Sequence, residues 1–168
     1  MISYKQYGLN QMKSYEVIEM DDKVKEFWIK FCNEKKLPKD IKYESWSFGN
    51  TKEMADELAE LVNCKIKTAT TSAYELYEVG EHIPQVGEYN IILNGSEEPV
   101  CITQTKVVYI MPYHLITPEH AWHEGEGDRS YRYWREVHDR FFYEEYKLVG
   151  KIFYEQAPML CEVFEKIY

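Results

Sequence analysis

The sequence predicts an α+β domain in which helices precede and follow a region of strands. Three patterns support this class. Apolar residues recur at helical spacing before residue 63, runs rich in β-branched residues lie between residues 67 and 111, and a second long helical pattern follows residue 129. Because the 168 residues hold no repeat and no long linker, we expect a single domain over residues 1–168.

Two amphipathic helices are expected in the first third of the chain. The segment 21–35 carries one apolar face, and Leu37-Pro38 ends it. The aromatic segment 43–49 is interpreted as an ordered connector. Asn50 and Glu53 have the spacing of a capping box, which predicts a second helix that ends near residue 63.

The middle of the chain is expected to form strands. The Thr-rich run 67–72 favours an extended strand that leaves the second helix. Residues 89–93 and 100–105 flank a turn at Asn94-Gly95, and residues 107–111 continue or bend the second strand. A hairpin with a long turn is therefore predicted.

Two helical segments and a closing strand complete the prediction. Thr117-Pro118 has the residues of a helix start, and the glycines within 124–128 should end that helix. Apolar residues over 131–146 recur at helical spacing, whereas residues 160–168 alternate as in a strand.

The net charge of −9 disfavours general binding of duplex DNA, because the field of the whole molecule repels phosphates. A single nucleotide or a short single strand remains possible, since salt confines such fields to about 8 Å. No run approaches the ~20 apolar residues of a membrane span, and residues 1–10 lack the apolar core of a signal peptide. We therefore expect no membrane association and a cytoplasmic location.

Lys67 and Thr70 are the first candidates for chemistry. Their side chains point to opposite faces of an ideal strand, yet a twist or bulge at the start of the strand would bring both to one cavity. A desolvated lysine with a lowered pKa could then take a proton from the threonine hydroxyl and create a nucleophile. The alternative is an exposed lysine on a solvated strand.

The acidic glycine segment that follows is the second candidate. Its glycines can aim Glu124, Glu126 and Asp128 into a pocket or toward a cation. The cations and hydroxyl that follow suit phosphate, although an internal Glu–Arg network is an equal alternative. These residues are Arg129, Ser130, Arg132 and Arg135.

Three histidines, His114, His120 and His123, raise the question of a metal. Their order matches neither His-Glu-x-x-His nor its inverted variant, so capping and core hydrogen bonds explain them better. The four cysteines form no Cys-x-x-Cys pair, and no glycine-rich phosphate loop is present. We expect no metal and no cofactor.

Several short motifs together resemble the longer bacterial branch of the ASCH domain family, from about residue 43 to residue 168. Each is weak alone, but their order and spacing agree with the family. They are Trp46-Ser47-Phe48-Gly49, Lys67-Thr68-Ala69-Thr70, Leu93-Asn94-Gly95, Glu124-Gly125-Glu126-Gly127-Asp128-Arg129-Ser130, and Trp134-Arg135 with His138.

The resemblance implies a PUA-like fold, a small β-barrel of mostly antiparallel strands surrounded by helices. Residues 1–43 would be an N-terminal helical extension packed on the barrel, and residues 44–168 the ASCH core. Families of this fold commonly serve RNA metabolism. A shorter bacterial branch hydrolyses the amide of N4-acetylcytidine with a lysine, a threonine and a glutamate, which match Lys67, Thr70 and Glu124. Lys65 and Ser72 stand where that branch has glycine and arginine.

Two main functions follow from these residues. In a binding module, Lys67 and three further cations contact the phosphates of RNA or of a nucleotide, while Trp46 or Tyr74 stacks on a base. The further cations are Lys65, Arg129 and Arg132.

In an amidohydrolase, Thr70 attacks an acyl carbon, Lys67 activates it as the base, and Glu124 shuttles protons to the leaving amine. A third reading is cleavage of RNA itself by the same groups. A homodimer formed through the aromatic N-terminal helix also stays open.

Overall fold

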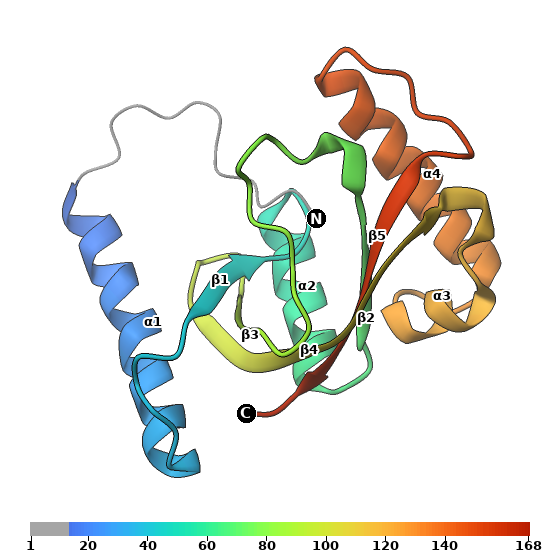
Figure 1. The fold of residues 1–168 in the computed structure, drawn as a ribbon. Helices are drawn as coiled ribbons and strands as arrows, with labels where there is room; N and C mark the ends of the chain where they lie inside the picture. Colours follow the sequence, from blue (N-terminus) through green and yellow to red (C-terminus); the bar gives the residue numbers. More distant parts are fainter. Residues whose placement is uncertain (1–13) are drawn as a thin grey trace.

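The computed structural model describes residues 14–168, with side chains from residue 22 onward, and the described part forms one five-stranded sheet with helices packed on it (Figure 1). The elements in chain order are α1 (Ser14–Lys35), β1 (Tyr43–Ser47), α2 (Lys52–Asn63), β2 (Ala69–Ala73), β3 (Tyr89–Leu93), β4 (Pro99–Pro112), α3 (Pro118–Glu124), α4 (Tyr131–Leu148) and β5 (Pro158–Lys166). The α+β class is confirmed.

The sheet has the strand order β1-β3-β4-β5-β2 and is mostly antiparallel, with β1 parallel to β3 as the exception. The long strand β4 pairs with β3 through its first half and with β5 through its second half. A register shift between Thr105 and Val107 bends β4 between these halves. The edge strands β1 and β2 are not paired with each other, so the sheet curls as a barrel does without closing.

Helices α1 and α2 lie on opposite faces of β3 and β4. Ile91 and Ile102, which are paired across the two strands, pack with α1 around the buried Trp28. Their neighbours Ile92 and Cys101 pack with α2. Because successive side chains of a strand point to opposite faces, this alternation places one helix on each side of the sheet.

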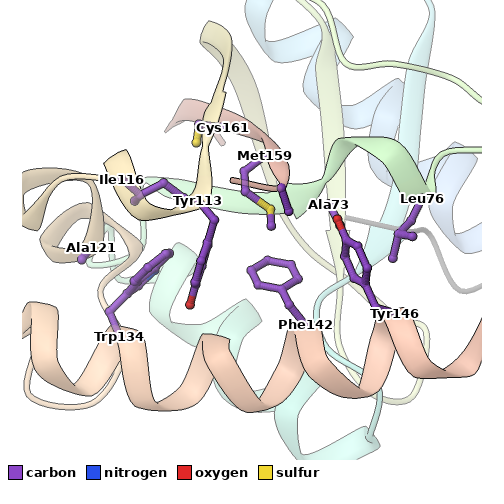
Figure 2. Packing of buried hydrophobic residues seen from close by; sticks show 11 residues of the cluster. Ala73, Leu76, Tyr113, Ile116, Ala121, Trp134, Phe142, Tyr146, Met159 and Cys161 are labelled. Carbon is purple, nitrogen blue, oxygen red and sulfur yellow. The ribbon is translucent and has the colours of Figure 1, made fainter. Parts of the chain in front are cut away.

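Helices α3 and α4 cover the outer face of β2, β5 and the second half of β4. Trp134, Phe142 and Tyr146 lie on one stripe of α4 and point toward Tyr113 and Met159 (Figure 2). All five side chains are almost completely buried. This cluster fixes the start of α4 against α3, and the polar site described below is built at that junction.

Three local predictions were wrong: the type of one segment, the residue that caps α2 and the start of α1. The segment Tyr43–Ser47 is strand β1, not a connector, because pairing with β3 satisfies its backbone. Thr51, not Asn50, caps α2, and its hydroxyl accepts a hydrogen bond from the backbone N–H of Met54. Helix α1 begins at Ser14, seven residues before the predicted start, whereas residues 1–10 lie outside the described part.

No helix within residues 14–168 is long and apolar enough to cross a membrane.

The packing of α1 predicts that the N-terminal extension belongs to the same cooperative unit as the sheet. Trp28 is 2% exposed, whereas its neighbour Ile29 is 41% exposed. We expect Trp28→Ala to lower the free energy of unfolding by about 3–5 kcal/mol, because it empties a large core position. Urea unfolding measures this, with Ile29→Ala as the matched control. Equal, small losses in both variants would show that α1 is not docked.

Candidate functional site

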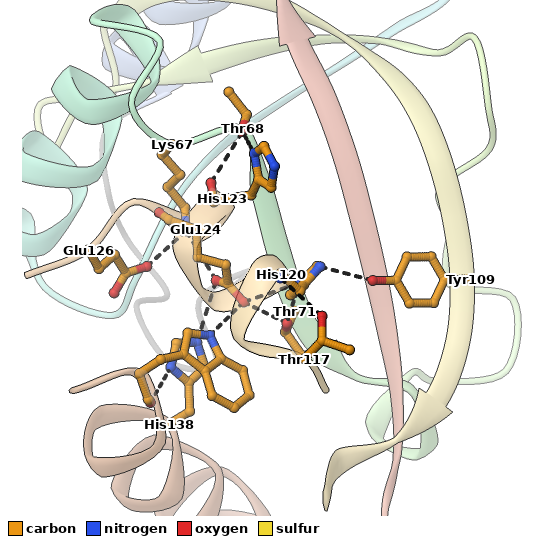
Figure 3. Close-up of polar contacts among 11 residues, drawn as sticks. Lys67, Thr68, Thr71, Tyr109, Thr117, His120, His123, Glu124, Glu126 and His138 are labelled. Carbon is orange, nitrogen blue, oxygen red and sulfur yellow. Dashed lines mark hydrogen bonds and ion pairs between the residues drawn. The ribbon is translucent and has the colours of Figure 1, made fainter. Parts of the chain in front are cut away.

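The site lies where the end of α2, strand β2, the end of α3 and the start of α4 meet (Figure 3). The backbone N–H of Thr68 donates to the carbonyl of His123 at 2.7 Å and joins β2 to α3. Gly125 follows α3 with a φ of 77°, and a Cβ there would stand 2.6 Å from the carbonyl oxygen of Ile66. Only glycine therefore lets the end of α3 approach the segment that carries Lys67.

The Lys67 ammonium is the centre of the site. It donates to Glu126 Oε1 at 2.8 Å, to Glu124 Oε2 at 3.2 Å and to the backbone carbonyl of Glu124 at 3.4 Å. An ammonium has three N–H donors, so each finds an acceptor. The Lys67 side chain is 1% exposed and its Nζ lies 5.2 Å from the centre of the Phe48 ring. Lys67 is thus a buried cation, not the solvated lysine of the alternative reading.

Charge balance in the site favours the protonated lysine. Burial by itself would lower the pKa of Lys67, but the carboxylates of Glu126 and Glu124 outweigh it and raise that pKa. A general base needs a lowered pKa, which is what the sequence led us to expect. The pKa of Lys67 is instead raised, because two carboxylates contact the one ammonium. The sequence did not reveal this contact.

Glu124 is held as a fixed anion. Its Oε1 accepts from the Thr71 hydroxyl at 2.6 Å and from the Trp134 indole N–H at 2.8 Å, while Oε2 faces Lys67. Burial alone would raise the pKa of Glu124, yet Lys67, His138 and His120 together hold it well below its usual value. A carboxylate so completely paired is poorly suited to shuttle protons.

Two histidines complete the network. His138 donates from Nδ1 to the Trp134 carbonyl at 2.9 Å, and its Nε2 lies 3.5 Å from Glu124 Oε2. His120 lies between Tyr109 and Thr71, with its Nδ1 3.0 Å from the Tyr109 hydroxyl and its Nε2 3.0 Å from Thr71 Oγ1. Because the Thr71 hydroxyl donates to Glu124, these contacts assign the Nε2–H tautomer to His120.

Thr70 lies apart from this network. On β2 it is paired with Glu162 of β5, and strand alternation places its side chain on the opposite face from Thr71. Among the described residues, no hydrogen bond joins its hydroxyl to Lys67 or to Glu124. Glu162 is buried, and burial raises the pKa of its carboxyl group. The geometry therefore brings together Lys67 and Glu124 of the predicted catalytic set and places Thr70 on another face.

Three of the other predicted ligand residues, Asp128, Ser130 and Arg135, contact parts of the protein itself. Asp128 and Ser130 cap the start of α4: the Ser130 hydroxyl accepts from the Tyr133 backbone, and Asp128 accepts from the Ser130 backbone. Arg135 forms a bidentate pair with Glu155, a glutamate outside the acidic glycine segment, and lies over the Tyr113 ring.

Trp46 lies on β1 and Tyr74 directly after β2. The Trp46 indole donates to Asn90 at 2.9 Å, and its ring contacts Phe48 edge-on. Tyr74 follows β2 directly and is 38% exposed. Lys65, which has a φ of 60°, and Arg132 are exposed. Arg129 and Glu126 belong to the loop between α3 and α4, which we call the glycine loop (residues 125–130).

Sequence reasoning missed Thr71, His120, Tyr109 and Trp122 as members or neighbours of the site. The signal that could have found His120 is its i,i+4 spacing from Glu124 on one short helix, which places both on one face. Tyr109 lies on β4, and the pairing of β4 with β5 and of β5 with β2 brings it to His120, which no local pattern in the sequence indicates.

Glu124, Glu126 and His138 present one ligand atom each within 4.8 Å of one another, a spacing that can suit a metal ion. The Lys67 ammonium contacts both carboxylates and supplies the positive charge that these groups require. A metal ion would have to displace it. The arrangement is therefore explained by the ion pairs, and we assign no metal to it.

The contact of His138 with Glu124 predicts a pH-dependent contribution to stability. Burial lowers the pKa of His138, but Glu124 outweighs it, so the folded-state pKa is raised above 6.5. The contribution is then complete below 6.5 and is lost as pH rises through the folded-state pKa. We expect wild type to exceed His138→Gln in unfolding free energy by more at pH 5.5 than at pH 9, measured by urea unfolding. A difference that does not change with pH would contradict this.

Comparisons with known proteins agree on one family. The ASCH domain family model matches residues 44–168. The crystal structure of an ASCH domain from Lactobacillus crispatus is 31% identical, with a TM-score of 0.72 over 75% of this chain and 80% of that one. Protein EF3133 from Enterococcus faecalis is 34% identical, with a TM-score of 0.76 over 87% of this chain and 93% of that one.

The search of curated proteins found no match. Both similarities agree with the mixed α+β, PUA-like fold described above. The family model spans β1 to β5, including every residue of the Lys67 network. On this match and these identities, the chain belongs to the ASCH domain family.

Proposed function

We propose that this protein binds RNA through a nucleotide whose oxygen is recognised by the Lys67 ammonium. The observation that carries this proposal is the asymmetry between the two carboxylates on Lys67. Glu124 is 1% exposed and held by several donors, whereas Glu126 is 19% exposed and lies on the glycine loop. Glu126 is the partner that a ligand can replace.

Burying a charged network costs folding free energy, so a protein that keeps one usually needs it for function. Moving an ammonium and a carboxylate out of water costs several kcal/mol per ion, and apolar residues of similar size often stabilise a core as well or better. Clusters of buried charges with shifted pKa values gather at functional sites for this reason. The Lys67 network, at the junction of four segments, fits this pattern.

The chemistry of the site suits an oxygen acceptor. All three donors of Lys67 are occupied, so a ligand can bind only by displacing one acceptor. A carbonyl oxygen of a pyrimidine or an oxygen of a phosphate can take the place of Glu126 Oε1. The centre of the Phe48 ring lies 5.2 Å from the ammonium, and Trp46 packs edge-on against Phe48. We place this binding in the cytoplasm, where RNA is abundant and the four free cysteines stay reduced.

The displacement model predicts that weakening Glu126 strengthens binding. Glu126→Gln keeps the shape of the side chain but turns a charge-assisted bond into a weaker one. We expect affinity for cytidine monophosphate to rise about fivefold, which corresponds to roughly 1 kcal/mol. Isothermal titration calorimetry measures it.

Glu144→Gln is the matched control, because Glu144 is exposed on α4 and the variant has the same net charge. Its affinity should equal that of wild type. An equal gain in both variants would reduce the effect to long-range charge, and no gain in Glu126→Gln would contradict displacement.

A second candidate function is amide hydrolysis of an acylated nucleoside. The direct contact between Lys67 and Glu124 favours it, since the resemblance assigns these two positions to catalysis. With its raised pKa, Lys67 would stabilise the developing oxyanion instead of acting as the base. Water would add across the amide, releasing acetate and the free amine.

Incubation with N4-acetylcytidine and with a short RNA separates these functions. We expect both compounds to bind while acetate release and strand cleavage stay at background. If acetate is released, Thr70→Val and Thr71→Val identify the nucleophile, because the two hydroxyls lie on opposite faces of β2. Turnover that Thr70→Val alone abolishes would replace the binding function by hydrolysis.

A further inference from the structure

An exposed tryptophan and an arginine are stacked beside the Lys67 site. Trp122 is 49% exposed, whereas His120, Ala121 and Glu124 on the same short helix are buried. The guanidinium carbon of Arg129 lies 3.5 Å from the centre of the Trp122 ring, and its Nε donates to the Trp122 carbonyl at 3.2 Å. Together they form a cation–π pair, which we call the Trp122–Arg129 stack.

The geometry of Arg129 is specific. Its φ of 61° is a left-handed conformation, which is unfavourable for a non-glycine residue. The Nε bond uses one of the five guanidinium N–H donors. Among the described residues, no side chain accepts a hydrogen bond from the terminal nitrogens. The chain thus holds a planar cation flat on an exposed ring and leaves most of its donors available.

The stack has a fixed place relative to the Lys67 site. The backbone N–H of Arg129 donates to the carbonyl of Glu126 at 2.9 Å, which closes a tight turn in the glycine loop. Glu126 contacts Lys67 at 2.8 Å. On the other side, Trp122 precedes His123, whose ring contacts the Thr68 hydroxyl next to Lys67. The two surfaces are therefore neighbours on one short loop and one helix end.

We infer that the Trp122–Arg129 stack is a second nucleotide subsite, in which a base of single-stranded RNA stacks on the face of the Arg129 guanidinium that is turned away from Trp122. This inference rests on the proposed function and extends it from one nucleotide to a strand. Unpaired bases stack on aromatic rings and guanidinium planes, and the free donors of Arg129 suit the adjoining phosphate. A duplex would keep its bases stacked inside, and the net charge of −9 disfavours its approach.

The test compares a short strand with a mononucleotide. Binding of tetracytidylate and of cytidine monophosphate is measured for wild type, Trp122→Ala and Arg129→Lys. Base stacking contributes about 1–3 kcal/mol. We therefore expect Trp122→Ala to weaken tetracytidylate binding about tenfold and to leave the mononucleotide affinity within twofold. Arg129→Lys keeps the charge but removes the planar guanidinium. It should therefore also weaken the binding of tetracytidylate and leave that of the mononucleotide unchanged.

Tyr143→Ala is the matched control. Tyr143 is 56% exposed on α4, with the Lys147 ammonium 5.8 Å from its ring centre, and so is another exposed cation–π pair. It should bind both ligands as wild type does. Thermal unfolding of each variant checks that the fold is retained.

The outcomes separate the two proposals. The second subsite is overturned if Trp122→Ala does not lower the affinity for tetracytidylate. It is also overturned if this variant lowers the affinities for tetracytidylate and for the mononucleotide equally. If wild type binds the strand through Trp122 but does not bind the mononucleotide, the subsite stands and the Lys67 function falls. If wild type binds the mononucleotide, and binds tetracytidylate no more tightly than the mononucleotide, only the second subsite is overturned. Absence of binding to either ligand overturns both.

Discussion

The ion pair between the Lys67 ammonium and the Glu124 carboxylate is the interaction on which the site depends. Both side chains are 1% exposed, so neither charge is tolerable without the other. Their contact requires the end of α2 and the end of α3 to lie together, which Gly125 permits by leaving room for the Ile66 carbonyl. Thr71, Trp134 and His138 then orient Glu124 from β2 and α4. The network joins the two halves of the fold because every charge in it needs a partner.

This network also explains why the glycine loop is the part of the site that can respond to a ligand. Glu124 is held by donors from three segments, whereas Glu126 contacts Lys67 from a loop that contains Gly125 and Gly127. The same loop turns back at Arg129 and lays its guanidinium on Trp122. A six-residue connection thus places one buried cation, Lys67, close to one half-buried stacked cation, Arg129, in a strongly acidic chain.

Much of the fold could be predicted, because local sequence patterns indicate most of its helices and strands. The cap at Thr117, the glycines after residue 124 and the apolar stripe of α4 gave helix boundaries close to those observed. Strand β1 was not predictable in the same way, since its five residues become a strand only by pairing with β3, more than forty residues later. At the site, the pairing of Lys67 with the acidic glycine segment was expected from the family resemblance. The contact of the Thr71 hydroxyl with Glu124, with Thr70 on the other face of β2, was not.

The sequence by itself determined the α+β class, the order of most helices and strands, the family and two members of the central ion pair. These follow from local patterns of apolar residues, caps and glycines, and from motifs whose spacing is fixed along the chain. Only the tertiary structure decided the state of each charge and the face on which each hydroxyl lies. The pKa of Lys67 rises instead of falling because two carboxylates from a distant segment surround it. Such effects depend on distances between atoms far apart in the sequence, which no local pattern encodes.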